Sequence, residues 1–207
     1  MTNIVIACDD DDHDLGGFFK ACADDLNAFF EGDNYVIETI SSSSRRLNSA
    51  YLQIVIEKIS VSPFIICPYS HGESGSLLCG NEKYIEKDVS THLFLDSLFY
   101  SFSCFTSLEL GKSLIESGCK AFVGYKNKAS IWTTYQSPFV ECANHAMKMF
   151  SKGHTLSSAF NMMIDRHNQE IDKIYTADFL IASIIMENRD GLVLLGDEEV
   201  TIEDFKH

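Results

Sequence analysis

The chain has 207 residues, 45% of them hydrophobic and 22% charged, which is typical of globular proteins. Its 16 Lys and Arg against 30 Asp and Glu give a formal net charge of −14. Because nucleic-acid phosphates and anionic membrane surfaces are bound by clustered cationic side chains, this balance argues against both partners. The length predicts one domain over residues 1–207, large enough to fold without disulfides or a metal ion.

The first third of the chain alternates predicted strands and helices. Short β-branched and apolar runs predict buried parallel strands, whereas apolar residues at three- and four-residue steps predict amphipathic helices. In chain order we expect a strand at 3–8, a helix at 18–30 that ends near Gly32, a strand at 35–40, a helix at 47–59 and a strand at 64–67.

A turn-rich segment at 68–75 follows the third strand, and Gly80-Asn81 then predicts a β-hairpin within 77–85. Alternation resumes after the hairpin and predicts an α/β fold, in which a mostly parallel sheet of about six strands has helices on both faces. The remaining expected elements are a short helix at 89–95, a strand at 98–104, a helix at 108–117 with Gly118 at its end, a strand at 121–125, helices at 138–150, 155–174 and 176–186, and a strand at 192–195.

The seven cysteines are scattered, and none has a CxxC or CxxH spacing, so the pattern favours neither a zinc nor an iron–sulfur site. The N-terminal residues lack the pattern of a secretory signal peptide, and no apolar run reaches the ~18 residues of a membrane span. We therefore expect a cytoplasmic protein with free thiols and with neither a metal nor another cofactor.

Functional groups of such a sheet gather at the carboxyl ends of its strands, where this sequence places His71 and Cys104. Cys104 is expected to open into a helix whose N–H groups favour a thiolate nucleophile, with His71 as base and acid. The N–H groups of Gly72 and Cys104 would form an oxyanion hole. Taken singly, a core thiol and an ordinary loop histidine are the alternatives, but their joint placement favours a dyad.

These segments resemble the caspase-like clan of cysteine peptidases, which includes caspases, metacaspases, legumain, gingipains, separase and CHAT domains. The clan's ordered pattern is an apolar strand ending in His-Gly, a small hairpin, an apolar strand ending in the nucleophilic Cys, then a helix and another strand. It extends here from Ile4 to Asp197, and the matching segments are 64–72, 76–86, 99–106, 121–125 and 192–197.

The resemblance implies a caspase–hemoglobinase-like three-layer α/β/α sandwich, with the hairpin after the catalytic His strand. It also implies peptide-bond hydrolysis by a Cys–His dyad without a cofactor. The sequence departs from the clan at three points. The caspase signature Gln-Ala-Cys-x-Gly is absent, Glu73 follows Gly72, and Phe102 occupies a position that in metacaspases holds an acid of the S1 pocket.

In this clan the loop after the first strand contributes to S1, the pocket for the P1 residue that precedes the scissile bond. Caspases carry an Arg there to bind Asp, whereas relatives that cleave after Lys or Arg carry acids. Here the loop carries Asp9, Asp10, Asp11 and Asp12, which predicts a basic P1 residue because a cationic side chain entering a partly dry pocket needs a carboxylate. The alternative is a merely solvated acidic loop or a calcium site, although Asp9-x-Asp11 lacks the Gly and the distal Glu of an EF-hand loop. Lys126 and Lys128 would instead favour an acidic substrate.

The sequence thus predicts a cysteine endopeptidase that acts on a protein or peptide, with an activating protein or a processing protease as further partners. Resemblance to CHAT domains implies bacterial signalling or defence, with cleavage of a partner protein. Two other classes stay open. One is a catalytically silent caspase-like module that binds a partner peptide. The other is a flavodoxin-like nucleotide-binding or receiver domain, which explains the acidic loop but not the hairpin.

Overall fold

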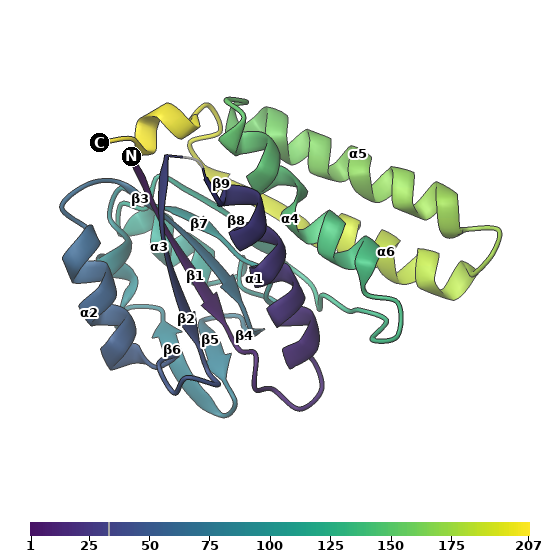
Figure 1. Ribbon diagram of the computed structural model, residues 1–207, viewed down its shortest axis with the longest axis horizontal. Helices are drawn as coiled ribbons and strands as arrows, with labels where there is room; N and C mark the ends of the chain where they lie inside the picture. Colours follow the sequence, from purple (N-terminus) through teal and green to yellow (C-terminus); the bar gives the residue numbers. More distant parts are fainter. Residues whose placement is uncertain (33) are drawn as a thin grey trace.

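A six-stranded sheet in the order β2-β1-β3-β7-β8-β9 forms the centre of the computed structural model, which describes residues 1–32 and 34–207 (Figure 1). Strand β9 is antiparallel to β8, and the other neighbouring pairs are parallel, so the predicted mostly parallel sheet is confirmed. The strands are β1 (Thr2–Cys8), β2 (Tyr35–Ser41), β3 (Phe64–Tyr69), β7 (Leu98–Tyr100), β8 (Ala121–Tyr125) and β9 (Leu192–Gly196).

Helices cover both faces of this sheet, because successive side chains of a buried strand point to opposite sides. In β1, Ile4 and Ile6 pack among the helices of one face, whereas Val5 and Ala7 pack on the other. The first face carries α1 (Gly16–Phe30), α4 (Ser137–Ser151), α5 (Leu156–Ile174) and α6 (Phe179–Gly191), and the second carries α2 (Ser49–Ile59) and α3 (Leu110–Glu116). The arrangement is compatible with a three-layer α/β/α sandwich (Figure 1).

A second, antiparallel sheet follows β3 and has the order β4-β5-β6. Its strands are β4 (His71–Glu73), β5 (Ser76–Cys79) and β6 (Glu82–Glu86). The predicted hairpin is confirmed, and Gly80 at its turn has a φ of +56°. Strand β4 was not expected, because its His-Gly-Glu sequence is made of residues common in turns. The pairing of β4 with β5 fixes the backbone on which His71 stands.

Two predicted boundaries near Cys104 are wrong. Strand β7 ends at Tyr100 and continues only as an isolated bridge at Phe102, and α3 begins at Leu110 rather than 108. The Thr106 hydroxyl donates to the Ser103 carbonyl, so this polar stretch forms a turn between strand and helix. Gly118 follows α3 with a φ of +93°, as its expected place at the helix end requires.

Helix α6 also begins later than predicted, at Phe179, because the Asp178 side chain accepts hydrogen bonds from the N–H groups of Leu180 and Ile181 and so caps the helix. Two short 3₁₀ helices complete the fold, η1 (Thr91–Phe94) and η2 (Ile202–Phe205). In the part of the chain that the structure describes, no helix is both long and apolar enough to span a membrane.

Candidate active site

The loops that follow β1, β3 and β7 lie at one edge of the sheet, because these strands are parallel neighbours. The first loop carries the four aspartates, the second leads into His71, and the third carries Cys104. The expected gathering of these groups at the carboxyl edge is therefore what the topology produces.

His71 is held by a carboxylate. Its Nε2 atom lies 3.2 Å from Asp12 Oδ2, and its ring packs edge-on against Phe19 with 5.6 Å between ring centroids. Asp12 is itself fixed, since its Oδ1 atom accepts hydrogen bonds from the N–H groups of Leu15 (2.7 Å) and Asp14 (3.0 Å). A sequence of four adjacent aspartates could not show which of them meets the histidine.

The Asp12 carboxyl is a good acceptor for His71. Burial tends to raise its pKa, but the Leu15 N–H and the charge of His71 outweigh burial and hold the pKa below its usual value. An ionised carboxylate only accepts hydrogen bonds, so Nε2 must carry the proton of this contact. In the neutral form of the imidazole, the lone pair is therefore on Nδ1, which is the atom able to act as a base.

Gly72 brings the backbone after His71 against the backbone around Cys104. A methyl group built on Gly72 would lie 2.6 Å from the Cys104 carbonyl oxygen and 2.9 Å from both Ser103 Cβ and Thr106 Cγ2. Only glycine allows this approach without displacing the neighbouring segment. The contact places the two segments whose N–H groups were predicted to form an oxyanion hole next to one another.

Cys104 is partly buried beneath Ala129. Its Sγ atom lies 3.5 Å from the Ala129 carbonyl oxygen, to which the thiol donates, and it accepts from the Ala129 N–H at 3.3 Å. Burial raises the pKa of the thiol, although the Ala129 N–H and the Lys128 charge act in the opposite direction. The expectation of a thiolate favoured by a helix start is therefore wrong, because α3 begins six residues later and burial dominates.

The residue after Cys104 has a strained backbone. Phe105 has a φ of +61°, in the left-handed region that residues with a Cβ avoid at a cost of about 1–2 kcal/mol. Its N–H donates to the Asn127 carbonyl at 3.1 Å, and the Ser107 N–H donates to the Tyr125 carbonyl at 3.1 Å. The end of β8 thus holds a sharp turn at Cys104, and such strain concentrates at functional sites.

The other three aspartates of the loop have separate environments. Asp9 is buried and accepts from the Gly80 N–H at 3.3 Å, which ties β1 to the hairpin turn. Asp10 accepts from the Ser43 N–H at 2.9 Å and from the Ser43 hydroxyl at 2.6 Å. Asp11 is exposed, and its N–H donates to the Ser42 hydroxyl at 2.9 Å. Of these three S1 candidates, Asp11 presents its carboxylate to solvent.

Phe102, the remaining S1 candidate, lies in the core. It is 5% exposed, and its ring packs edge-on against Phe18 and Tyr125 at centroid distances of 4.9 and 5.2 Å. Because the side chain of Phe102 supports the sheet from within, it does not face a substrate.

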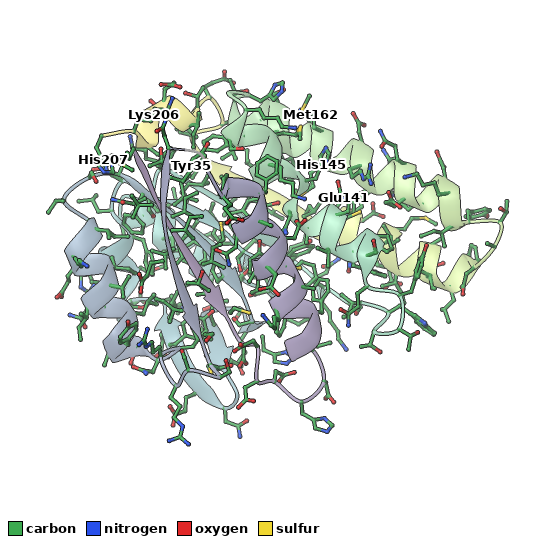
Figure 2. All side chains as sticks on the ribbon, viewed as in Figure 1. Tyr35, Glu141, His145, Met162, Lys206 and His207 are labelled. Carbon is green, nitrogen blue, oxygen red and sulfur yellow. The ribbon has the colours of Figure 1, made fainter. Side chains whose placement is uncertain are left out.

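Two other histidines, His145 and His167, belong to the helical layer. His145 and Glu141, both labelled in Figure 2, lie one turn apart on α4. His145 Nδ1 is 3.6 Å from Glu141 Oε1. His167 is buried on α5 and donates from Nδ1 to the Met163 carbonyl, and burial lowers its pKa to about 4. These contacts are those of packing residues.

A pocket of about 610 Å³ lies elsewhere, between α2 and strands β1 and β2. Its wall is mainly aliphatic, with Val36, Ile54 and Val61 among the lining residues, and it includes neither His71 nor Cys104. In the described residues, no group of three or more His, Cys, Asp or Glu side chains is arranged to hold a metal ion. The polar contacts at the sheet edge therefore define the candidate site.

Comparison with known proteins gave no match to a family model and no curated protein of similar sequence.

Proposed function

We propose that this protein is a cysteine endopeptidase with Cys104 as nucleophile and His71 as general base and acid. The observation that supports the proposal most is the meeting of three loops at one sheet edge: Asp12 fixes the His71 ring, and Gly72 lies against the Cys104 backbone. The resemblance to the caspase-like clan, stated from the sequence, adds the same pair of residues in the same order.

In the proposed reaction, His71 Nδ1 takes the proton of the Cys104 thiol, and Sγ attacks the carbonyl carbon of the scissile peptide bond. The resulting oxyanion accepts hydrogen bonds from the Gly72 and Cys104 N–H groups. The C–N bond then breaks while His71 gives its proton to the leaving amine. Water, activated by His71, hydrolyses the thioester and restores the thiol. Asp12 keeps the imidazole in the tautomer that this sequence of steps needs.

For substrate choice, we propose cleavage after Lys or Arg, with the exposed Asp11 as the carboxylate that meets the cation. Asp9 and Asp10 then act indirectly, because their bonds hold the neighbouring loops in place. The proposed setting is bacterial signalling or defence in the cytoplasm, where a partner protein is cut. The free cysteines fit a reducing compartment.

The second candidate is a catalytically silent module that binds a peptide at the same edge. One observation favours it: the Cys104 thiol is covered by Ala129, and burial raises its pKa. A silent module would bind peptide but neither form a thioester nor turn substrate over.

The deciding experiment measures hydrolysis of fluorogenic peptides that differ only at P1, by wild type, Cys104→Ala and His71→Ala. Turnover of Lys or Arg peptides by wild type alone, with kcat/KM reduced in Asp11→Asn, is the expected result. Cys79→Ser is the matched control, since Cys79 is the other cysteine that is only partly buried and serine keeps a donor for the Asp9 carboxylate. Binding without turnover in every variant would favour the silent module, and cleavage only after Asp or Glu would overturn the basic preference.

A further inference from the structure

The segment 126–130 lies over Cys104 and is held from the far side by α6. Its residue Ala129 touches the Cys104 sulfur through both backbone groups, N–H at 3.3 Å and carbonyl oxygen at 3.5 Å. Ala129 is 5% exposed although its neighbours Lys128 and Asn127 are exposed, so this one residue is pressed inward onto the sulfur.

The hydrogen bonds that hold segment 126–130 in this position come mainly from one side chain. Asn188 on α6 is 3% exposed; its Oδ1 accepts from the Ser130 N–H at 2.9 Å and its Nδ2 donates to the Ser130 carbonyl at 2.7 Å. A single amide thus satisfies both backbone polar groups of Ser130, the residue that follows Ala129. The Lys126 N–H also donates to the Gly191 carbonyl at the end of α6, at 2.8 Å.

This cover favours the thiol over the thiolate. A thiol can donate to the Ala129 carbonyl, but a thiolate cannot, and it would instead face the partial negative charge of that oxygen. The cover also keeps water from the sulfur, and burial is the largest influence on this thiol. The Ala129 N–H and the Lys128 charge act the other way but are smaller. Displacing segment 126–130 would therefore favour the reactive form and open the path to the sulfur.

We propose that Asn188 is a positioning residue that latches segment 126–130 over Cys104 and so holds the thiol in a state of low reactivity until the segment moves. The biological meaning of this latch rests on the proposed function, in which Cys104 is the nucleophile. Its physical content does not, because the reactivity of a thiol is measured without a peptide substrate.

The test is the rate at which iodoacetamide alkylates Cys104, followed across pH by mass spectrometry of the Cys104 peptide. In Asn188→Ala we expect this rate at pH 7 to rise about tenfold, which corresponds to one unit of thiol pKa, and the midpoint of the pH–rate curve to fall. Asn188→Asp is the second variant, for use if the alanine variant does not fold. It keeps the side-chain volume but replaces the donor to the Ser130 carbonyl by an acceptor, so the alkylation rate of Cys104 should again rise.

Two matched controls should keep the wild-type rate. Ser130→Ala retains both backbone groups that Asn188 bonds, and Asn168→Ala removes a 2.7 Å bond to Arg189 of α6 without touching the segment. Alkylation of Cys67, which is fully buried, reports global opening in the same sample. An unchanged or slower rate at Cys104 in Asn188→Ala overturns the latch, as does an equal rise at Cys67.

Failure of the latch and failure of the peptidase are separable. Faster alkylation in Asn188→Ala with no peptide hydrolysis by any variant leaves the latch in place and removes the proposed function. Peptide hydrolysis by wild type, with no change in the alkylation rate of Cys104 in Asn188→Ala, supports the proposed function and overturns the latch.

Discussion

Three carboxylates of the loop after β1 have different partners, although the sequence shows only a run of aspartates. Asp9 ties the hairpin turn, Asp10 ties the loop after β2, and Asp12 meets His71. Their roles differ because the partners lie in the β5–β6 turn, in the loop after β2 and in β4, which are distant from one another in the sequence. The role of each aspartate therefore depends on tertiary contacts, which the local sequence does not show.

Asp12→Asn is expected to lower kcat for peptide hydrolysis about tenfold or more while leaving the fold intact. The asparagine Oδ1 can still accept from the Leu15 and Asp14 N–H groups, but its NH₂ group would face the His71 Nε2 proton. Steady-state kinetics with a cleaved peptide measures the effect. Asp14→Asn, on an exposed side chain of the same loop, should leave kcat unchanged, and equal losses in both variants would contradict the assigned role.

Gly72→Ala is expected to reduce the free energy of unfolding by about 1–3 kcal/mol, because its methyl group would overlap the Cys104 carbonyl. Urea denaturation measures the change. Gly17→Ala is the control, since a methyl group there meets nothing within 4 Å and replaces a glycine inside α1. That variant should be as stable as wild type or more so, by up to about 1 kcal/mol. A neutral Gly72→Ala would show that the two segments can separate freely.

At the scale of elements, buried runs were predictable and polar ones were not. The strands that begin at Phe64 and Ala121 are uninterrupted apolar runs, so their burial on both faces could be predicted from the sequence. Strand β4 consists of residues that are common in turns, and it is extended because it pairs with β5. The start of α3 was misplaced because Thr106 and Ser107 bond to the backbone of a turn, an outcome that depends on β8.

The candidate site follows the same division. His71 and Cys104 were predictable because each follows an apolar strand at the carboxyl edge of a parallel sheet. The Asn188 latch was not, because it joins residues 58 positions apart through one side chain on a helix face. Neither was the raised pKa of Cys104, which depends on burial of the thiol in the folded chain.

The Asp178 cap carries a prediction for α6. Asp178→Ala removes the acceptor of two N–H groups at the start of the helix and should cost about 1 kcal/mol of unfolding free energy. Thermal unfolding followed by circular dichroism measures it. Asp165→Ala, at an exposed position within α5, is the matched control and should be near neutral. Equal stability of both variants would mean that the cap does not determine where α6 begins.

For the whole molecule, the buried His167 makes folding sensitive to acid. Its folded-state pKa is about 4, below the ordinary value of 6.5, so protons bind the unfolded chain more readily. The stability associated with a neutral His167 is complete above about pH 6.5 and is lost as pH falls toward 4. This residue alone should reduce the free energy of unfolding by about 2 kcal/mol between pH 7 and pH 5.

Urea denaturation of wild type and His167→Gln at both pH values isolates this effect. Burial lowers the pKa of His145 as well, but that contribution is present in both proteins and cancels in the difference. The glutamine variant should lose about 2 kcal/mol less between the two pH values. An identical pH dependence of wild type and variant would exclude His167 as its source.

The topology of the central sheet has a consequence for how the protein is made. The Asp12–His71 contact spans 59 residues, the Cys104–Ala129 contact 25 and the Asn188–Ser130 contact 58. Parallel strands close such long loops late, and a chain emerging from the ribosome folds only what has already been synthesised. A nascent chain that ends before α6 already contains Cys104 but lacks Asn188. The Cys104 thiol is therefore present before the residue that latches segment 126–130 over it. Synthesis and folding thus pass through an interval in which Cys104 is least protected.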